Sequence, residues 1–165
     1  MEQLALLLSK YKNKGVLVDS NLLLVYCVGV YDPTRIARFK RTAAFTSEDF
    51  ELLAQFFAFF EKVVTTPNIL TEVNSLSNQL SADLKTAYYV KFAKQISLLE
   101  EHYVVSSEVS ALPAFDRLGL TDLGIAELVR DKYLVLSDDL KLIVYLQGIG
   151  VDAINFNHIR AFGWN

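Results

Sequence analysis

Residues 15–24, GVLVDSNLLL, contain a short aliphatic run that leads directly into polar residues. The aliphatic residues Val16–Val18 are typical of a buried strand, and Asp19 follows them immediately. An unpaired carboxylate in apolar surroundings costs free energy. Asp19 is therefore expected either to cap a helix that starts at Leu22 or to be held at the end of the strand for chemistry.

Four later segments share the β-favouring character of this first run. They are Lys62–Thr65, His102–Val105, Tyr133–Leu136 and Val151–Ile154. The stretches between them are long enough for helices, so the pattern predicts an α/β fold around a mostly parallel sheet. Central parallel strands are covered on both faces, which agrees with the continuous apolar character of these runs.

Several residues mark where helices begin and end. Thr46 is expected to open a helix, and Thr66 with the following Pro67 has the pattern of an N-cap and a first helical residue. Thr121 is interpreted in the same way as an N-cap. The helix that begins near Asp139 is expected to end at the glycines of 148–150.

Composition limits the class of protein. A chain of 165 residues, half of them hydrophobic and with a net charge of −3, predicts one globular domain over residues 1–165. Its charge argues against coating nucleic acid by bulk electrostatics. The longest apolar stretch, residues 16–31, is interrupted near its start by Asp19, which leaves too little to cross a bilayer. We therefore expect a cytoplasmic protein without a membrane partner.

Acidic residues are expected to gather at one edge of the predicted sheet. Asp19 follows the first strand, and Asp138 and Asp139 follow the fourth, at the ends where open α/β sheets build their sites. Glu72 and Asp122 fall on or beside the buried faces of two helices. Carboxylates brought together repel one another, and a hard divalent cation such as Mg²⁺ or Mn²⁺ removes that cost. The sequence thus suggests an acidic metal pocket.

Each acid also has a simpler explanation. Asp19 is suited to capping a helix, and Glu72 could be a solvated helix residue. Asp122 and the pair at 138–139 are favoured by the dipole in the first turn of a helix. Only the combination of these positions favours a common site over separate caps.

Four segments together resemble the acidic motifs of the PIN domain family, whose members include VapC-type toxin ribonucleases. They are VLVDSN at 16–21, NILTEVNSL at 68–76, GLTDLGIAEL at 119–128 and VLSDDLKL at 135–142. The resemblance extends from about residue 15 to residue 155. It implies a three-layer α/β/α sandwich with a mostly parallel sheet of about five strands.

The resemblance also assigns roles to individual residues. It implies that the catalytic and metal-binding acids are Asp19, Glu72, Asp122 and Asp139. Asn21, Ser137 and Asp138 would support them, and Asp138 stays an alternative for the fourth acid. The implied activity is Mg²⁺- or Mn²⁺-dependent endoribonuclease cleavage of RNA, in which a metal-bound water attacks the phosphodiester. A VapC-type member would have an antitoxin as partner, and PIN domains commonly form homodimers. The alternative is a degenerate PIN-like module that binds RNA or a protein without cleavage.

A longer helical segment at about 31–61 separates the first two acids and departs from the compact toxin members. It carries a basic group that consists of Arg35, Arg38, Lys40 and Arg41. This group is expected to contact RNA phosphates beside the acidic pocket. Its alternative interpretation is an ordinary solvated helix face or loop.

Overall fold

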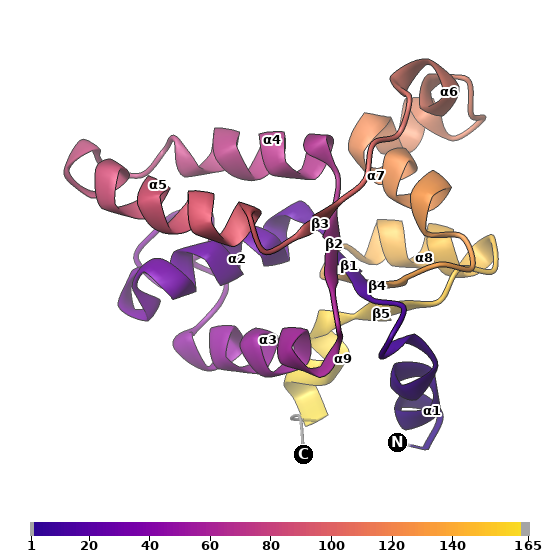
Figure 1. The fold of residues 1–165 in the computed structure, drawn as a ribbon, viewed down its shortest axis with the longest axis horizontal. Helices are drawn as coiled ribbons and strands as arrows, with labels where there is room; N and C mark the ends of the chain where they lie inside the picture. Colours follow the sequence, from indigo (N-terminus) through magenta and orange to yellow (C-terminus); the bar gives the residue numbers. More distant parts are fainter. Residues whose placement is uncertain (1, 163–165) are drawn as a thin grey trace.

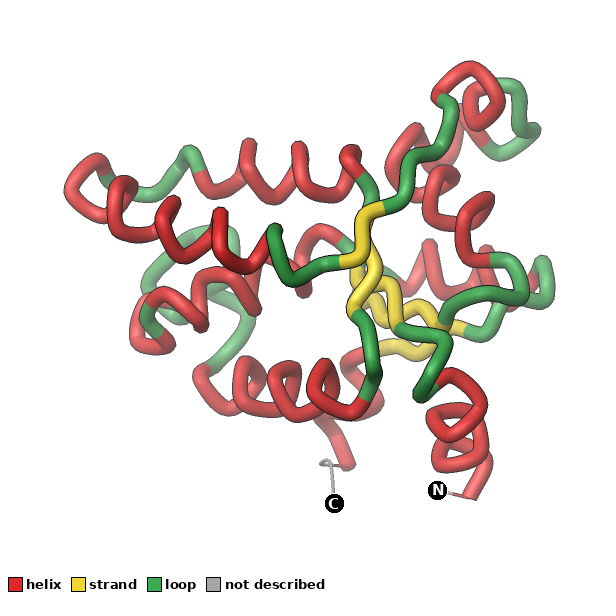
Figure 2. The backbone as a smooth tube through the Cα atoms, in the orientation of Figure 1, coloured by secondary structure: helices red, strands yellow, loops and turns green. Residues whose placement is uncertain are grey.

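The first aliphatic run forms the central strand of a parallel sheet in the computed structural model, which describes residues 2–162 (Figures 1 and 2). Within these residues the sheet has five strands in the order β3-β2-β1-β4-β5. The strands are β1 Val16–Val18, β2 Val63–Thr65, β3 Glu100–Glu101, β4 Leu134–Ser137 and β5 Ala153–Asn155. All four neighbouring pairs are parallel, and Leu17 of β1 stands opposite Val64 of β2 and Val135 of β4.

Helices cover both faces of this sheet, so the predicted three-layer α/β/α sandwich is confirmed. Figure 1 shows α2, α3, α4 and α5 on one side of the strands and α1, α6, α7 and α8 on the other. The bounds are α1 Glu2–Tyr11, α2 Ser20–Tyr31, α3 Ser47–Phe59, α4 Pro67–Ser77, α5 Ala82–Ile96, α6 Ser106–Ser110, α7 Phe115–Val129, α8 Leu140–Gly148 and α9 Phe156–Phe162. A short 3₁₀ helix, η1, covers Pro33–Arg35. Among the described residues, no helix has both the length and the apolar character that crossing a membrane requires.

The third strand lies earlier than predicted. The sequence pattern placed it at 102–105, whereas β3 consists of Glu100 and Glu101. His102 still donates its backbone N–H to the carbonyl of Thr65 at 3.0 Å, but β2 ends at that residue. The chain beyond His102 therefore has no strand to pair with, and its apolar residues lead into α6 instead. Charged residues on an edge strand such as β3 also discourage pairing with other chains.

Of the three threonines predicted to cap helices, two do so and one does not. Thr46 caps α3 in a reciprocal capping box with Asp49, and the side chain of Thr66 accepts from the backbone N–H of Ile69 at 3.3 Å. Thr121 does not cap a helix but lies inside α7. That helix is interrupted at Gly119, whose φ of 76° is accessible to glycine at little cost. The segment at 31–61 contains η1 and α3, joined by turns.

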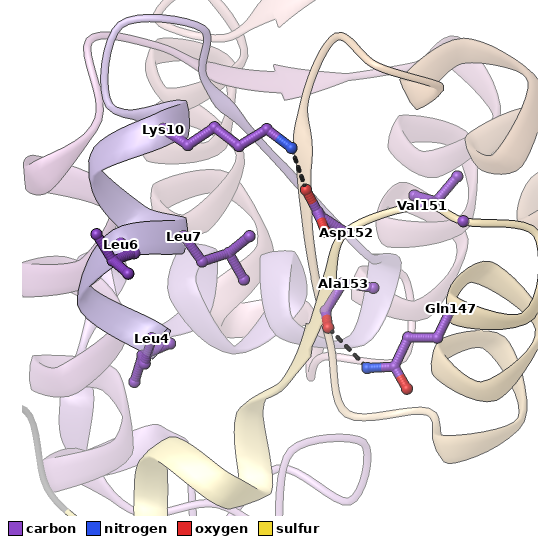
Figure 3. A pocket seen from close by; sticks show the side chains of 9 residues that line it. Leu4, Leu6, Leu7, Lys10, Gln147, Val151, Asp152 and Ala153 are labelled. Carbon is purple, nitrogen blue, oxygen red and sulfur yellow. Dashed lines mark hydrogen bonds and ion pairs between the residues drawn. The ribbon is translucent and has the colours of Figure 1, made fainter. Parts of the chain in front are cut away.

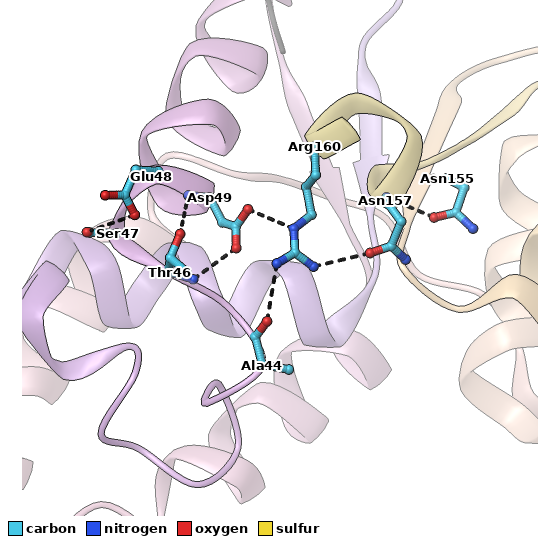
Figure 4. Close-up of polar contacts among 8 residues, drawn as sticks. All are labelled: Ala44, Thr46, Ser47, Glu48, Asp49, Asn155, Asn157 and Arg160. Carbon is cyan, nitrogen blue, oxygen red and sulfur yellow. Dashed lines mark hydrogen bonds and ion pairs between the residues drawn. The ribbon is translucent and has the colours of Figure 1, made fainter. Parts of the chain in front are cut away.

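Ion pairs fix the two terminal helices to the body of the protein. Arg160 of α9 donates from Nε to the carboxylate of Asp49 at 2.8 Å and also reaches the carbonyl of Ala44 at 3.3 Å (Figure 4). At the other end of the chain, Lys10 of α1 lies 2.7 Å from the carboxylate of Asp152, just before β5 (Figure 3). Both contacts join residues more than 100 positions apart in the sequence.

Thr65 carries a buried hydroxyl for which the described residues provide no hydrogen-bond partner. Valine has a similar shape with a methyl group in place of the hydroxyl, so Thr65→Val removes an unsatisfied polar group from the core. We expect this substitution to raise the free energy of unfolding by about 1 kcal/mol, measured by urea denaturation. Thr66→Val at the next position should do the opposite, because it removes an N-cap worth about 1 kcal/mol. A Thr65→Val protein less stable than the parent would contradict this assignment.

Candidate functional site

A cavity of about 290 Å³ opens at the carboxyl ends of β1 and β4. These two strands flank the point at which the strand order reverses, because β2 and β3 lie on one side of β1 and β4 and β5 on the other. Open α/β sheets bind their ligands at this topological switch point. The residues that line the cavity include the four acids expected from the sequence, Asp19, Glu72, Asp122 and Asp139.

Asp19 is both a helix cap and a residue of the cavity, so the two interpretations of this carboxylate are compatible. One of its oxygens accepts from the backbone N–H of Leu22 at 2.9 Å and caps α2. The other accepts from the hydroxyl of Ser137 and from the backbone N–H of Asp138. Only 6% of the residue is exposed. Burial, reinforced by the negative charge of Asp138, raises the pKa of Asp19 to about 7.

Glu72 joins three helices through its two carboxylate oxygens. One oxygen accepts from the hydroxyl of Ser20 in α2 at 2.6 Å, and the other accepts from the hydroxyl of Thr121 in α7 at 2.5 Å. Sequence reasoning missed both hydroxyls as parts of the site. The position of Ser20 next to Asp19 was an available signal, whereas the contact of Thr121 depends on how α4 and α7 pack together.

Asp122 holds the least constrained carboxylate of the four. The residue is half-buried in α7, and its side chain accepts no hydrogen bond from the described residues. Burial raises its pKa to about 6, with further contributions from the nearby charges of Asp139 and Glu72. Lys141 opposes this shift but does not cancel it. The carboxylate oxygens of Asp122 are therefore available to a ligand, and their negative charge is only partly compensated.

The two aspartates that follow β4, Asp138 and Asp139, have different contacts. Asp139 lines the cavity and caps α8, because its Oδ1 accepts from the backbone N–H groups of Lys141 at 2.7 Å and Leu142 at 3.2 Å. Asp138 instead faces Asn21, whose amide lies 3.5 Å from its carboxylate. Ser137 connects the two strand ends, since its hydroxyl donates to Asp19 and accepts from the backbone N–H of Asp139 at 2.9 Å.

The donor set has the chemistry that a hard cation prefers, but its carboxylates are not drawn into one compact cluster. Residues 2–162 contain no group of three or more His, Cys, Asp or Glu side chains arranged to hold a metal ion. Carboxylate oxygens in excess of nearby cations are nevertheless the donors that Mg²⁺ and Mn²⁺ favour. Mg²⁺ typically retains several waters and uses only one or two carboxylates with substrate phosphates. The residues present fit such a loosely coordinated ion.

The basic group lies apart from this cavity. Arg35, Arg38 and Lys40 line a second cavity of about 310 Å³ together with residues that follow α4. Arg41 joins the same region through a 2.7 Å hydrogen bond to Gln79. The acids and the basic residues therefore line two different cavities.

A third hollow lies between α1 and β5 and has a different chemistry (Figure 3). This groove of about 750 Å³ is lined largely by aliphatic side chains, among them Leu4, Leu7 and Val151. Its charged residues, Lys10 and Asp152, are paired with each other. It contributes no cluster of catalytic groups.

Fold and site together define an α/β protein with an acidic cavity at the switch point of a parallel sheet. Comparisons of the chain with family models, curated proteins and solved structures find no match. Inference about its function therefore depends on the residues of the cavity and on the sequence motifs that supply them.

Proposed function

We propose that this protein is a metal-dependent endoribonuclease of the PIN type that cleaves RNA phosphodiester bonds with Mg²⁺ or Mn²⁺. The observation that carries the proposal is the position of Asp19, Glu72, Asp122 and Asp139 around one cavity at the carboxyl edge of the sheet. These residues come from four separate segments of the chain. Helix capping explains Asp19 and Asp139, but it does not explain the half-buried carboxylate of Asp122 or the two hydroxyls that orient Glu72.

Each acidic residue has a definable task in such a site. When bound, the divalent ion supplies charge neutralisation, activates a water molecule and stabilises the leaving oxygen. Asp122 offers oxygens without other partners, and Asp139 keeps its Oδ2 outside the helix cap. Glu72 retains lone pairs because each carboxylate oxygen accepts more than one hydrogen bond. Ser20 and Thr121 fix its orientation, which limits the reorganisation needed when a ligand enters.

The hydrogen bonds around Asp19 set the geometry of the strand ends. Ser137 and the backbone of Asp138 hold one oxygen of Asp19, and Asn21 holds Asp138 in turn. The residues expected to support the acids, Asn21, Ser137 and Asp138, are thus joined to Asp19 by one chain of hydrogen bonds. An antitoxin and a second copy of the chain are the protein partners that the toxin interpretation would add to the RNA substrate.

A second candidate is a PIN-like module that binds RNA or a protein without cleaving. One observation favours it: among residues 2–162, no three acidic, His or Cys side chains form a group that could hold a metal ion. The two functions differ in whether Asp122 is needed for chemistry.

Cleavage of a mixed pool of labelled RNA in Mn²⁺ or Mg²⁺ tests the choice. We expect the parent protein to cleave and excess chelator to stop it. Asp122→Asn should lower the rate at least about 100-fold, because it removes a charged oxygen that acts on the metal and the transition state. Glu127→Gln, which neutralises an exposed acid on the same helix, should cleave at the parent rate. Equal cleavage by Asp122→Asn and the parent would contradict the proposed function.

A further inference from the structure

The second cavity is a basic cleft, which we define by Arg35, Arg38, Lys40 and Gln79. Its basic residues lie in the segment that follows α2, and Gln79 belongs to the turn between α4 and α5. Ser81, the N-cap of α5, also lines the cleft and makes no capping hydrogen bond with its side chain. The cleft therefore combines cationic side chains with the positive end of a 15-residue helix.

The cationic side chains of the cleft are of two kinds. Arg35 is held in place by the carboxylate of Asp32, which lies 3.4 Å away, and Arg41, which does not line the cleft, donates to Gln79 at 2.7 Å. Arg38 and Lys40 are exposed and form no ion pair with any described residue. Asp83 in the first turn of α5 interacts with Arg35 and offsets part of the charge. A net positive charge remains, and Arg38 and Lys40 are free to bind an anion.

One face of α4 links this cleft to the acidic cavity. Glu72 lines the acidic cavity, and Gln79, seven residues later in the sequence, lines the basic cleft. Asn78 keeps helical dihedral angles of −62° and −14° after the end of α4. Seven residues make about two helical turns, so Gln79 follows Glu72 on about the same side of α4, about 10 Å farther along its axis.

The surface of α4 between the two openings is accessible. Thr71 and Ser75 are exposed on successive turns of α4, and with Glu72 and Leu76 they line a shallow hollow of about 250 Å³. In Figure 1, α4 runs from the strand ends toward the turn that precedes α5. A ligand that extends from the acidic cavity along this helix would therefore meet hydroxyl groups first and cations next.

We propose that the basic cleft binds backbone phosphates of the same RNA strand whose scissile bond occupies the acidic cavity. That the bound molecule is this RNA strand rests on the proposed function, whereas the binding of an anion is argued from the residues of the cleft. Guanidinium groups recognise phosphate through paired hydrogen bonds, and Arg38 is unpaired and exposed for this purpose. With about 3.4 Å per stacked nucleotide, 10 Å corresponds to about three nucleotides. A trinucleotide has only two internucleotide phosphates, one such step apart, and is therefore too short to occupy both openings.

Binding of fluorescein-labelled RNA in chelator, measured by anisotropy, separates this inference from catalysis. The probes are a 12-nucleotide RNA of mixed sequence and a trinucleotide. Arg38→Ala/Lys40→Ala should weaken binding of the 12-mer at least about tenfold, and loss of two phosphate contacts should reduce the slope of log K against log salt by about 1.4. The trinucleotide should bind the parent more weakly than the 12-mer does, because it can occupy only one of the two openings.

Lys91→Ala/Lys94→Ala provides a matched control, because it removes the same charge from exposed positions on α5 that do not line the cleft. It should change the affinity less than twofold. Both double variants should keep the parent melting temperature, since none of the four side chains forms an ion pair with the described residues.

The possible results distinguish failure of this inference from failure of the proposed function. If Arg38→Ala/Lys40→Ala binds the 12-mer as tightly as the parent, the inference is overturned even if the parent cleaves RNA. If binding depends on these residues but the parent cleaves nothing, the phosphate site stands and the proposed cleavage fails. If a poly-glutamate peptide of equal charge displaces the 12-mer as effectively as unlabelled RNA, the cleft is an acidic-peptide site and the inference is overturned.

Discussion

Asparagine in place of Asp19 is expected to abolish metal-dependent RNA cleavage while the protein remains folded. We expect the fold to tolerate the change because asparagine caps helices as well as aspartate does, and its Oδ1 can accept from the backbone N–H of Leu22. Its amide NH₂ can donate to the hydroxyl of Ser137, although the backbone N–H of Asp138 loses its acceptor. The substitution also removes a buried charge whose ionisation is costly, as the raised pKa of Asp19 indicates. Metal-dependent cleavage should be lost, because the amide of asparagine supplies no negative charge to a divalent cation. We expect the cleavage rate to fall at least about 1,000-fold, which corresponds to about 4 kcal/mol of transition-state stabilisation.

Single-turnover cleavage of the labelled RNA pool measures this loss, and thermal unfolding verifies the fold. Asp131→Asn is a matched control for the change of carboxylate to amide. Asp131 is exposed and precedes β4, at the opposite edge of the sheet from the cavity, and its φ of 59° suits asparagine. The control should cleave like the parent. A folded Asp19→Asn protein with the parent rate would exclude Asp19 from the chemistry and leave helix capping as its role.

Much of the fold and the candidate site was predictable because parallel strands expose their carboxyl ends at a common edge. Asp19 and Ser137 end two runs of aliphatic residues, and each run became a strand of the sheet. Once these two strands are neighbours, the contact between Asp19 and Ser137 follows, although the residues are 118 positions apart. The helix cap of Asp19 was also predictable, because the residues that follow it favour a helix.

The parts that were predicted wrongly depend on partners that a local pattern does not contain. The position of the third strand is determined by the residue at which β2 ends. The apolar residues after His102 have no neighbouring strand with which to pair. Thr121 has the residue type of an N-cap, yet its hydroxyl serves Glu72 because α4 and α7 pack against each other. The basic residues near position 38 were expected to contact RNA phosphates, a role that stays a prediction, and the cavity that they line depends on packing that the local sequence does not show.

A second large effect is expected in the pH dependence of stability. The pKa values of Asp19 and Asp122 are about 7 and about 6 in the folded protein, against an ordinary value of 3.8. The native state therefore holds more protons than the unfolded state between about pH 4 and pH 7. Stability decreases with increasing pH wherever the native state binds more protons, so this window should show a loss on the order of a few kcal/mol. Asp32 and Asp152 have lowered pKa values, and they act in the opposite direction at more acidic pH.

A divalent cation should reverse this loss, because it binds the ionised carboxylates of the native state and competes with their protons. At 100 times its Kd, Mn²⁺ would add about 2.7 kcal/mol to the free energy of unfolding, or about 5–10 °C in Tm for a chain of this size. The increase should be large at pH 8 and small at pH 5, where Asp19 and Asp122 are mostly protonated. Thermal unfolding with chelator or Mn²⁺ at both pH values provides the comparison, with Asp19→Asn as the variant that should lose most of the shift. If Mn²⁺ leaves Tm unchanged at pH 8, the cavity does not bind the ion, and its acidic residues must be assigned to binding without cleavage.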